Sequence, residues 1–317
     1  MTLTCHYAKL DQEALLHLQG PDALTFLQGQ VTCDTRKLSP AVALPGACCT
    51  VQGRVVADFL LCTPVEDHLV LRLRRDIRAT LADVLAKYIV FSKATLDSGR
   101  EDWQVLACWG PGAPAALREI FGALPREQYG VCSGDGYTLI QIDEAGLQFE
   151  CYLQQGEVVR LQPQLEQLME ADTESNWQSL QIANGIARIE AGTTGEFIPQ
   201  MLNYDVTGHI SFNKGCYTGQ EVVARMHYRG KPKRRLYLAN IRGSDLPPRS
   251  PVAGDSLFGG GSDQPAGNII NRASAQDAGV DLLVTSTTKG IDAGLHLIDS
   301  EGPSLSTTPV PYPIPER

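Results

Sequence analysis

Apolar and polar residues alternate along the first quarter of the chain in the manner of short β-strands. Residues 13–20, E-A-L-L-H-L-Q-G, predict a strand that is closed by Gly-Pro. A short helix with Leu24 and Leu27 on one face is predicted to follow it. Three extended runs between Ala41 and Arg74 are separated by tight turns, and they predict an antiparallel meander.

Helical and strand-like patterns interleave over the next hundred residues. Residues 76–88 place their apolar side chains at helical spacing. Further strands are predicted at 103–108, 137–142 and 147–153, and further helices at 113–121, 158–169 and 177–189. Because hairpins alternate with helices, the pattern predicts an α+β fold rather than a doubly wound parallel sheet. No Gly-x-Gly-x-x-Gly follows a strand and no phosphate-binding loop occurs, so a dinucleotide site is not expected.

The composition changes near residue 236. The last 82 residues hold nine of the 19 prolines and ten of the 30 glycines, and they show no helical period. Short apolar runs separated by turn residues predict a small C-terminal β-barrel. These runs lie at 236–241, 268–273, 282–287 and 295–298. We therefore predict two regions, 1–235 with the α+β elements and 236–317 with the barrel, joined at the basic stretch 229–235.

Composition and charge exclude several classes of protein. With 43% hydrophobic and 20% charged residues, the chain has the composition of a folded globular protein. Its net charge of −9 repels nucleic acid and anionic membranes unless positive charge is concentrated locally. The first twenty residues carry charges where a signal peptide needs an apolar run, and no stretch has the length of a membrane span. We therefore expect a cytoplasmic protein with no membrane partner.

The cysteines and histidines do not predict a metal site. The nine cysteines are odd in number, form no Cys-x-x-Cys, and in places lie inside apolar runs such as residues 59–62. The six histidines show no His-Glu-x-x-His and no paired ligand spacing. Most of the thiols are thus expected to be small buried residues of a cytosolic protein.

One segment, residues 208–229, carries candidate chemistry. Thr218 and Glu221 have the spacing of a capping box ahead of a helix, so Cys216 is expected just outside a helix N-terminus. Lys214 precedes Cys216 by two residues, and positive charge together with a helix start favours a thiolate. The flanking glycines, Gly215 and Gly219, are expected to let the backbone turn closely around the thiol. The alternative is that this segment only makes a turn and Cys216 is buried beneath it.

The motif K-G-C-Y-T-G-Q-E at residues 214–221, with E-F-I-P-Q at 196–200 before it and V-A-R at 223–225 after it, resembles the YgfZ family of folate-binding proteins. That family is related to the glycine-cleavage T-protein, an aminomethyltransferase, and to mitochondrial iron–sulfur cluster assembly factors. The resemblance covers nearly the whole chain. It implies a ring of three domains around a tetrahydrofolate site, with two intertwined α+β domains in residues 1–235 and a C-terminal barrel in residues 236–317. It also implies a role in maintaining iron–sulfur enzymes, including those that thiolate tRNA.

Three residues correspond individually to T-protein positions. Asp58 ends a Gly-x-x-x-x-Asp like the one that ends in the T-protein's catalytic aspartate. Glu150 follows a Phe, as does the glutamate that binds the pterin, and Arg188 opens an R-I-E-A that resembles the R-L-E-A near the glutamate tail. A carboxylate suits the pterin donors, and an arginine suits a carboxylate tail. From the residues alone, Asp58 could equally be an outward hairpin residue and Arg188 a solvated charge at a helix end.

The resemblance also assigns roles within the motif itself. Together with the local signals described above, it leads us to expect Cys216, Lys214 and Asp58 to be the catalytic residues. It implies further that Tyr217, Gln220 and Glu221 bind the cofactor together with Asp58, Glu150 and Arg188. The T-protein has no cysteine in this segment, and its G-Y-T-G-E-D-G loop before the pterin glutamate is poorly matched here. Folate binding is therefore expected to survive, whereas lipoyl-linked aminomethyl transfer is not.

A basic cluster follows the motif. Between Val222 and Ser244 the chain has seven basic residues and no acidic one, with two tyrosines interleaved: Arg225, Arg229, Lys231, Lys233, Arg234, Arg235 and Arg242, with Tyr228 and Tyr237. The cluster could contact RNA, bind the polyglutamate tail of folate, or be a solvated linker. The acidic overall charge and the lack of an RNA-binding motif argue against direct tRNA binding.

Three functional hypotheses follow. The leading one is a tetrahydrofolate-binding accessory protein for iron–sulfur enzymes, with Cys216 as its functional thiol. The second is a folate-dependent one-carbon transferase in which Asp58 is the catalytic polar group. The third is an RNA-binding module that acts on tRNA directly.

Overall fold

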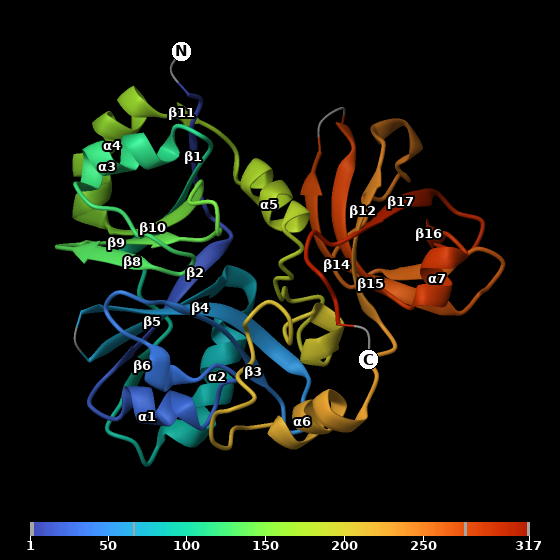
Figure 1. Cartoon of the computed structure of the whole chain (residues 1–317), viewed down its shortest axis with the longest axis horizontal. Helices are drawn as coiled ribbons and strands as arrows, with labels where there is room; N and C mark the ends of the chain where they lie inside the picture. Colours follow the sequence, from blue (N-terminus) through green and yellow to red (C-terminus); the bar gives the residue numbers. More distant parts are fainter. Residues whose placement is uncertain (1–2, 66, 276–277, 316–317) are drawn as a thin grey trace. The chain divides into compact units, whose positions relative to one another are not determined.

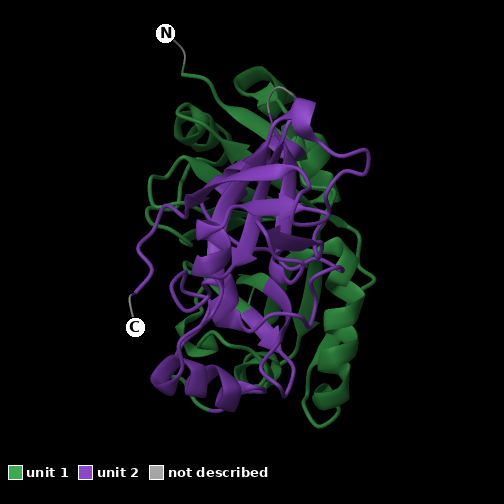
Figure 2. Cartoon of the chain, turned by 90° about the vertical axis from the view of Figure 1, so that its right-hand side faces the viewer, with its two compact units in different colours: residues 1–46, 59–174, 213–215 green, residues 47–58, 175–212, 216–317 purple. Residues whose placement is uncertain are grey.

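The computed structural model describes residues 3–65, 67–275 and 278–315. The chain forms two compact units, each assembled from separate segments (Figure 2). Unit 1 comprises residues 1–46, 59–174 and 213–215, and unit 2 comprises residues 47–58, 175–212 and 216–317. These units divide the chain differently from the predicted regions, because the barrel shares unit 2 with two earlier segments.

Unit 1 contains a six-stranded sheet of order β11-β1-β7-β10-β9-β8 (Figure 1). Its strands are β1 (His6–Lys9), β7 (Trp103–Trp109), β8 (Val131–Gly134), β9 (Tyr137–Gln141), β10 (Gln148–Gln154) and β11 (Glu170–Ala171). The pairs are antiparallel except β1 with β11. Helices α3 (Ala113–Phe121) and α4 (Gln155–Leu168) lie over one face of this sheet. Apolar residues of α3 and α4 share a core with buried side chains of β7, β9 and β10, which explains why their spacing is helical.

The predicted meander forms a second sheet, of order β3-β4-β5-β2-β6. Its strands are β2 (Glu13–Gln19), β3 (Leu44–Cys49), β4 (Val55–Val65), β5 (His68–Arg74) and β6 (Thr95–Asp97). Helix α1 (Ala23–Gln28) packs near β5 of this sheet, and helix α2 (Arg78–Ile89) packs near β2 and β6. The turn between β3 and β4 belongs to unit 2, as do the adjoining ends of both strands. The element pattern predicted for residues 13–89 is thereby confirmed.

The C-terminal part of unit 2 is a closed six-stranded barrel of order β12-β15-β14-β13-β16-β17. Its strands are β12 (Arg235–Ile241), β13 (Ser256–Gly259), β14 (Pro265–Ser274), β15 (Val280–Ser286), β16 (Leu295–Leu297) and β17 (Ser304–Pro309), with a short helix α7 (Thr288–Asp292). One apolar cluster drawn from all six strands fills the barrel. Closure removes the exposed edges that an open sheet would have. The predicted α+β class with a terminal barrel is confirmed, while the ring arrangement stays a prediction.

Two further helices bear on the candidate site. Helix α5 (Glu174–Ala183) ends earlier than residue 189, where the pattern placed its end. The reason is Gly185, whose φ of +70° is left-handed and stops the helix. Helix α6 (Gln220–Arg229) begins at the last two residues of the K-G-C-Y-T-G-Q-E motif and leads to the barrel. Within residues 3–65, 67–275 and 278–315, no helix has the length and apolar character needed to cross a bilayer.

A buried pair of histidines joins β2 to β5 in unit 1. The Nδ1 of His17 lies 2.8 Å from the Nε2 of His68. Burial is the main reason that the pKa of His17 falls to about 4, with His68 and Arg100 adding to the effect against the opposing charges of Asp102 and Asp97. Burial likewise lowers the pKa of His68. The folded chain therefore holds this pair without its extra protons at neutral pH.

The histidine pair predicts a loss of stability in mild acid. An unfolded histidine takes up its proton near pH 6.5, whereas His17 in the folded chain does so near pH 4. Above pH 6.5, the lowered pKa of His17 therefore does not change the free energy of unfolding. As the pH drops from 6.5 toward 4, that free energy falls by at most about 1.4 kcal/mol per pH unit for each proton that the unfolded chain takes up. Urea unfolding as a function of pH should show a shallower fall for His17→Gln. The control is His6→Gln in β1; equal slopes in all three proteins would contradict the prediction.

Candidate functional site

Cys216 differs from the other cysteines in its exposure. All nine cysteines lie in described residues, and Cys216 alone is exposed; Cys132 is half-buried and the remaining seven are buried. Burial raises the pKa of Cys33 and Cys48 to about 12, so these thiols stay protonated at neutral pH. The expectation that most cysteines are small buried residues is confirmed. The alternative that Cys216 is buried beneath a turn is wrong.

Lys214 has a well-defined partner set within unit 1. Its Nζ donates to the backbone carbonyls of Gln28 at 2.8 Å, Val31 at 2.5 Å and Cys33 at 2.8 Å. Burial lowers the pKa of Lys214 to about 8, against the opposing effects of Cys33 and Asp34. Three carbonyls around one ammonium anchor the start of the motif to the turn that follows α1. The structure thus gives Lys214 an anchoring role, while support of the Cys216 thiolate stays a prediction.

The helix after Cys216 does not begin with the predicted capping box. Its N-cap is Gly219, with a φ of +83° and no side-chain cap. Glu221 pairs instead with Arg225 one turn later, at 3.1 Å. The side chain of Gln220 accepts a hydrogen bond from the backbone N–H of Tyr217 at 3.2 Å, which closes the turn before the helix. The capping box is therefore wrong, and Tyr217, Gln220 and Glu221 have structural contacts within unit 2.

Gly219 is required by a close approach to the turn between β3 and β4. A Cβ at Gly219 would overlap the carbonyl oxygen of Thr50. On the other side, a Cβ at Gly53 would lie 2.8 Å from the Cβ of Val222 in α6. At Gly215 no such contact exists, because nothing lies within 4 Å of the position of its Cβ. The predicted close turn thus holds for Gly219 and is wrong for Gly215.

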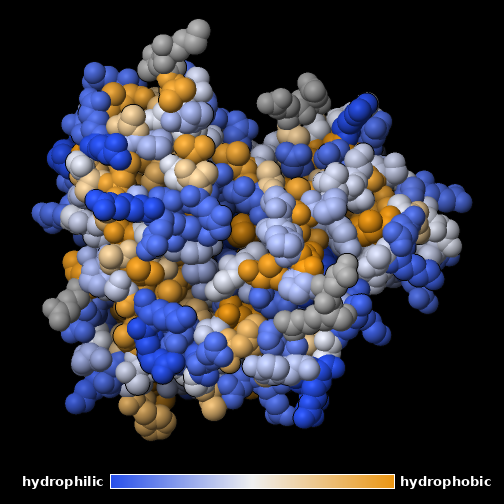
Figure 3. Space-filling view, in the orientation of Figure 1, coloured by the Kyte–Doolittle hydropathy of each residue, from blue (hydrophilic) through white to orange (hydrophobic). Residues whose placement is uncertain are grey.

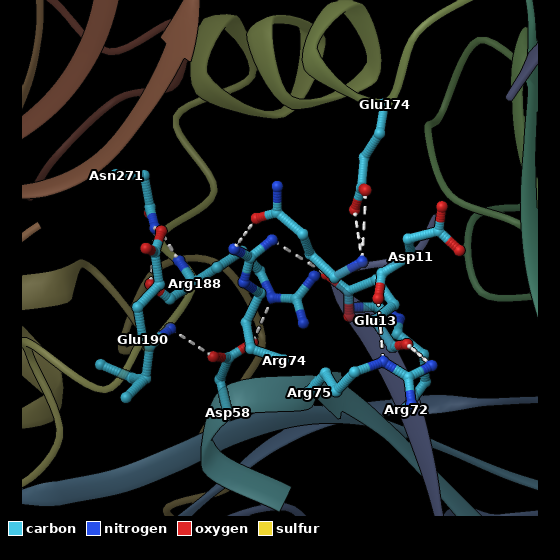
Figure 4. A network of polar contacts seen from close by, with 12 residues as sticks. Asp11, Glu13, Asp58, Arg72, Arg74, Arg75, Glu174, Arg188, Glu190 and Asn271 are labelled. Carbon is cyan, nitrogen blue, oxygen red and sulfur yellow. Dashed lines mark hydrogen bonds and ion pairs between the residues drawn. The ribbon is translucent and has the colours of Figure 1, made fainter. Parts of the chain in front are cut away.

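Asp58 and Arg188, separated by 130 residues, meet in unit 2 (Figure 4). The Oδ2 of Asp58 accepts from the Nε of Arg188 at 2.6 Å, and its Oδ1 accepts from the backbone N–H of Ile189 at 2.6 Å. Asp58 is 2% exposed, so a carboxylate there needs these donors. The idea that Asp58 is an outward hairpin residue is wrong, as is that of Arg188 as a solvated charge at a helix end, because α5 has ended before it.

A residue of the barrel forms hydrogen bonds with the R-I-E-A segment, residues 188–191. Asn271 in β14 accepts from the backbone N–H of Arg188 at 2.8 Å and donates to its carbonyl at 2.7 Å. It also donates to Glu190 at 2.7 Å (Figure 4). The register of β14 shifts between Ile269 and Asn271, and such a bulge redirects a side chain. Sequence reasoning missed Asn271, because the pattern of a strand does not show where a bulge falls.

Glu150 lies in unit 1, in a buried cluster of polar side chains. Its two oxygens accept from the guanidinium of Arg72, each at 2.8 Å, and the hydroxyl of Tyr152 donates at 2.9 Å. Burial alone would lower the pKa of Arg72, but Glu150, Tyr152 and Glu13 outweigh it and raise that pKa well above its ordinary value. Figure 4 shows Arg72 beside Glu13. The guanidinium thus stays charged although it is buried.

Arg72 and Glu13 were missed by sequence reasoning, although a signal was present. Strand β5 reads H-L-V-L-R-L-R, so its arginines alternate with leucines. Alternation suggests that the polar face meets water, yet all seven residues are buried. Strand β5 has a neighbouring strand on each side, and charged residues on such a strand indicate a buried ion pair. This is the signal that could have pointed to Arg72.

The sequence-predicted residues fall into two groups. Unit 2 holds Asp58, Arg188, Cys216, Tyr217, Gln220 and Glu221, whereas Lys214 and Glu150 belong to unit 1. Within the described residues, no group of three or more His, Cys, Asp or Glu side chains is arranged to hold a metal ion. The chemistry that these side chains offer is acceptance by carboxylates, donation by guanidinium groups, and an exposed thiol.

The basic cluster is divided in its roles. Arg235 forms a two-bond ion pair with Asp205, at 2.6 and 3.0 Å, with both side chains largely buried. Arg234 donates to Asn268 at 2.9 Å and to the carbonyl of Pro265. These two arginines stabilise the junction between α6 and the barrel. The other five basic residues are exposed, whereas Tyr237 packs against the core of the barrel.

Comparison with known proteins identifies the family. The GCVT N-terminal domain model matches residues 9–137. The tRNA-modifying protein YgfZ of Klebsiella pneumoniae (strain 342) is 31% identical over 305 residues, which are 96% of this chain and 91% of that protein. The chain belongs to the YgfZ family. The YgfZ protein of Sodalis glossinidius (strain morsitans) is 32% identical over 310 residues, 97% of this chain and 93% of that protein.

A solved structure supports the fold of this YgfZ-family chain. Aminomethyltransferase T of the glycine cleavage system from Bartonella henselae superposes with a TM-score of 0.73, covering 96% of this chain and 84% of that one. The two sequences are 16% identical, so the likeness shows the fold alone. The resemblance to the YgfZ family and to the T-protein fold, inferred from the motif, is confirmed.

The contrast between the two motif glycines gives a prediction about stability. Gly219→Ala would strain a left-handed backbone position and overlap the Thr50 carbonyl, and we expect it to lower the unfolding free energy by about 2 kcal/mol or more. Gly215→Ala meets open space and should stay within about 0.5 kcal/mol of the parent. Urea denaturation of the two variants tests this. Equal stabilities would show that α6 does not depend on its contact with the β3–β4 turn.

Proposed function

We propose that this YgfZ-family chain is a tetrahydrofolate-binding accessory protein that supports the assembly or repair of iron–sulfur enzymes, including tRNA-modifying ones, with Cys216 as its functional thiol. The observation that carries the proposal is the exposure of Cys216 in the K-G-C-Y-T-G-Q-E motif, while the other eight thiols are shielded to different degrees. An accessible thiol can exchange with a partner's sulfur or ligate its metal, whereas a buried one serves packing. The names of the relatives, tRNA-modifying protein YgfZ, agree with this class of client.

The polar residues are chemically suited to tetrahydrofolate. A carboxylate offers about four acceptor sites. Asp58 accepts two hydrogen bonds from the chain and Glu150 accepts three, so each retains acceptor capacity for the N–H groups of a pterin. Arg188 provides the charge for the ligand's carboxylate tail, beside the R-I-E-A backbone that Asn271 fixes. When bound, the folate would supply a reduced pterin ring that carries one-carbon groups.

No observation favours the alternative of a one-carbon transferase. Asp58, the residue that would act at the folate nitrogen, accepts a hydrogen bond from the Arg188 guanidinium at 2.6 Å. That arrangement suits binding and orientation of a ligand. We therefore propose binding rather than aminomethyl transfer.

The folate proposal predicts that two variants weaken binding. Glu150→Gln and Arg188→Lys each replace a charge-assisted contact by a poorer one, worth about 1.5–3 kcal/mol, so Kd for tetrahydrofolate should rise about 10- to 150-fold. Isothermal titration calorimetry under anaerobic conditions measures this. Arg160→Gln, which removes an exposed pair with Glu157 on α4, is the control and should bind as the parent does.

Folding must be checked in the same series, because Glu150→Gln leaves the buried Arg72 with Glu13 as its acidic partner, and breaking a buried ion pair costs up to about 3–5 kcal/mol. Circular dichroism identifies the variants that remain folded. If both folded variants bind tetrahydrofolate as the parent does, the residues are wrongly assigned. If the parent itself does not bind, the folate proposal fails.

The thiol proposal predicts site-selective alkylation. Iodoacetamide at neutral pH should label Cys216 of the native protein first, because it is the exposed thiol, and peptide mass spectrometry locates the label. Cys216→Ser should leave the unfolding free energy within about 0.5 kcal/mol of the parent, since the side chain is exposed. In cells that lack their own YgfZ, this variant should fail to restore the activity of iron–sulfur enzymes.

The matched control is Cys132→Ser, which alters a half-buried thiol in β8 of unit 1 and should restore activity. A Cys216→Ser variant that restores activity fully would overturn the role of the thiol without touching that of folate. Loss of tetrahydrofolate binding in Cys216→Ser would instead assign the residue to the ligand site.

A further inference from the structure

Three aromatic rings gather at the C-terminal end of α6 in unit 2, two from the helix itself and one from Phe212 before the motif. The ring of Phe212 stacks on that of His227, with centroids 3.6 Å apart and an interplanar angle of 18°. Tyr228 meets His227 edge-on at 4.8 Å, and its centroid lies 6.4 Å from that of Phe212. Tyr228 is nevertheless 66% exposed. The ring of Tyr228 is thus held by its neighbours but buries little of its own surface. Its position therefore adds little to the stability of the fold.

Positive charge surrounds these rings. Arg229, Lys231 and Lys233 are exposed, and none of them forms an ion pair with a residue that the structure describes. The remaining charge on this part of α6, Arg225, pairs with Glu221 in the solvent-exposed first turns of the helix. The region over α6, at the lower right of Figure 3, is strongly hydrophilic. A chain of net charge −9 thus gathers unneutralised positive charge next to its exposed ring.

The combination selects one class of ligand. A polyglutamate tail would use the basic side chains and leave the ring of Tyr228 without a role. A single-stranded RNA presents phosphates to lysine and arginine, and flat bases that stack on aromatic side chains. We propose that Tyr228, Arg229, Lys231 and Lys233 form a binding surface for single-stranded RNA, with Phe212 and His227 as the support that holds Tyr228.

This surface goes beyond the proposed function and stands without it. The Phe212–His227 stack joins the two ends of the segment that contains Cys216, so the same short stretch of sequence carries the exposed thiol and the aromatic group. The sequence alone argued against direct RNA binding, because of the acidic net charge and the lack of an RNA-binding motif. Net charge does not decide the matter where the local charge is positive and unpaired.

The test is fluorescence anisotropy with the full chain and a labelled twelve-nucleotide oligouridine, compared with an abasic phosphodiester of the same length. We expect the oligouridine to bind more tightly than the abasic strand. Tyr228→Ala should weaken its binding about tenfold or more, because stacking is lost, whereas Tyr228→Phe keeps the ring and should bind as the parent does. Because Tyr228 is exposed, neither variant is expected to unfold the chain.

The charged residues are tested by salt dependence. Replacing Arg229, Lys231 and Lys233 together by Gln should reduce the slope of log K against log salt by about 2, since each phosphate contact in a single strand contributes about 0.7. The charge-matched control replaces Lys37, Lys87 and Lys93, exposed lysines of unit 1, by Gln. An equal effect of the control, equal affinity for the abasic strand, or no RNA binding by the parent would each overturn the proposal. Tighter binding of polyglutamate that depends on the same three residues would overturn it in favour of an acidic tail.

Discussion

The buried carboxylate of Asp58 fixes the arrangement of unit 2 around it. A charge with 2% exposure has to be met by donors from the chain, and they come from Arg188 and the backbone of Ile189. This forces the R-I-E-A segment to run alongside β4 without being helical. Asn271 then satisfies the backbone of Arg188 from the barrel side. Three stretches far apart in sequence are thereby linked through one ion pair, and the conformation of the segment is set before any ligand arrives.

Local patterns were enough to predict most elements, because their signals are local. The meander and the helices α2, α3 and α4 each bury one face, and the period of apolar residues records it. The short strands β1, β8, β13 and β17 were missed, since four to six residues of mixed polarity become strands through their neighbours. The end of α5 and the start of α6 depend on backbone conformation at Gly185 and Gly219.

The candidate site was predicted unevenly, for a physical reason. Motifs were enough to single out Cys216, Asp58 and Arg188 as candidates. Their partners could not, because Asp58 pairs with a residue 130 positions away and Glu150 with one 78 positions away. A sequence shows which groups carry charge but not which of them share a proton or a hydrogen bond. The capping box failed similarly, since the approach of the Thr50 carbonyl decides where α6 begins.

Because most thiols are buried and one is exposed, the rates at which the native cysteines are modified would measure local opening of the structure. Cys62 in β4, Cys108 in β7 and Cys151 in β10 are buried in strands that have a neighbouring strand on each side, so a reagent reaches each of them only when its strand separates from its neighbours. Their modification rates would order the opening of the two sheets, with Cys216 as the internal standard for an unprotected thiol. The barrel has no cysteine, so its fluctuations would not be recorded, and the labelling kinetics would report on the two open sheets alone.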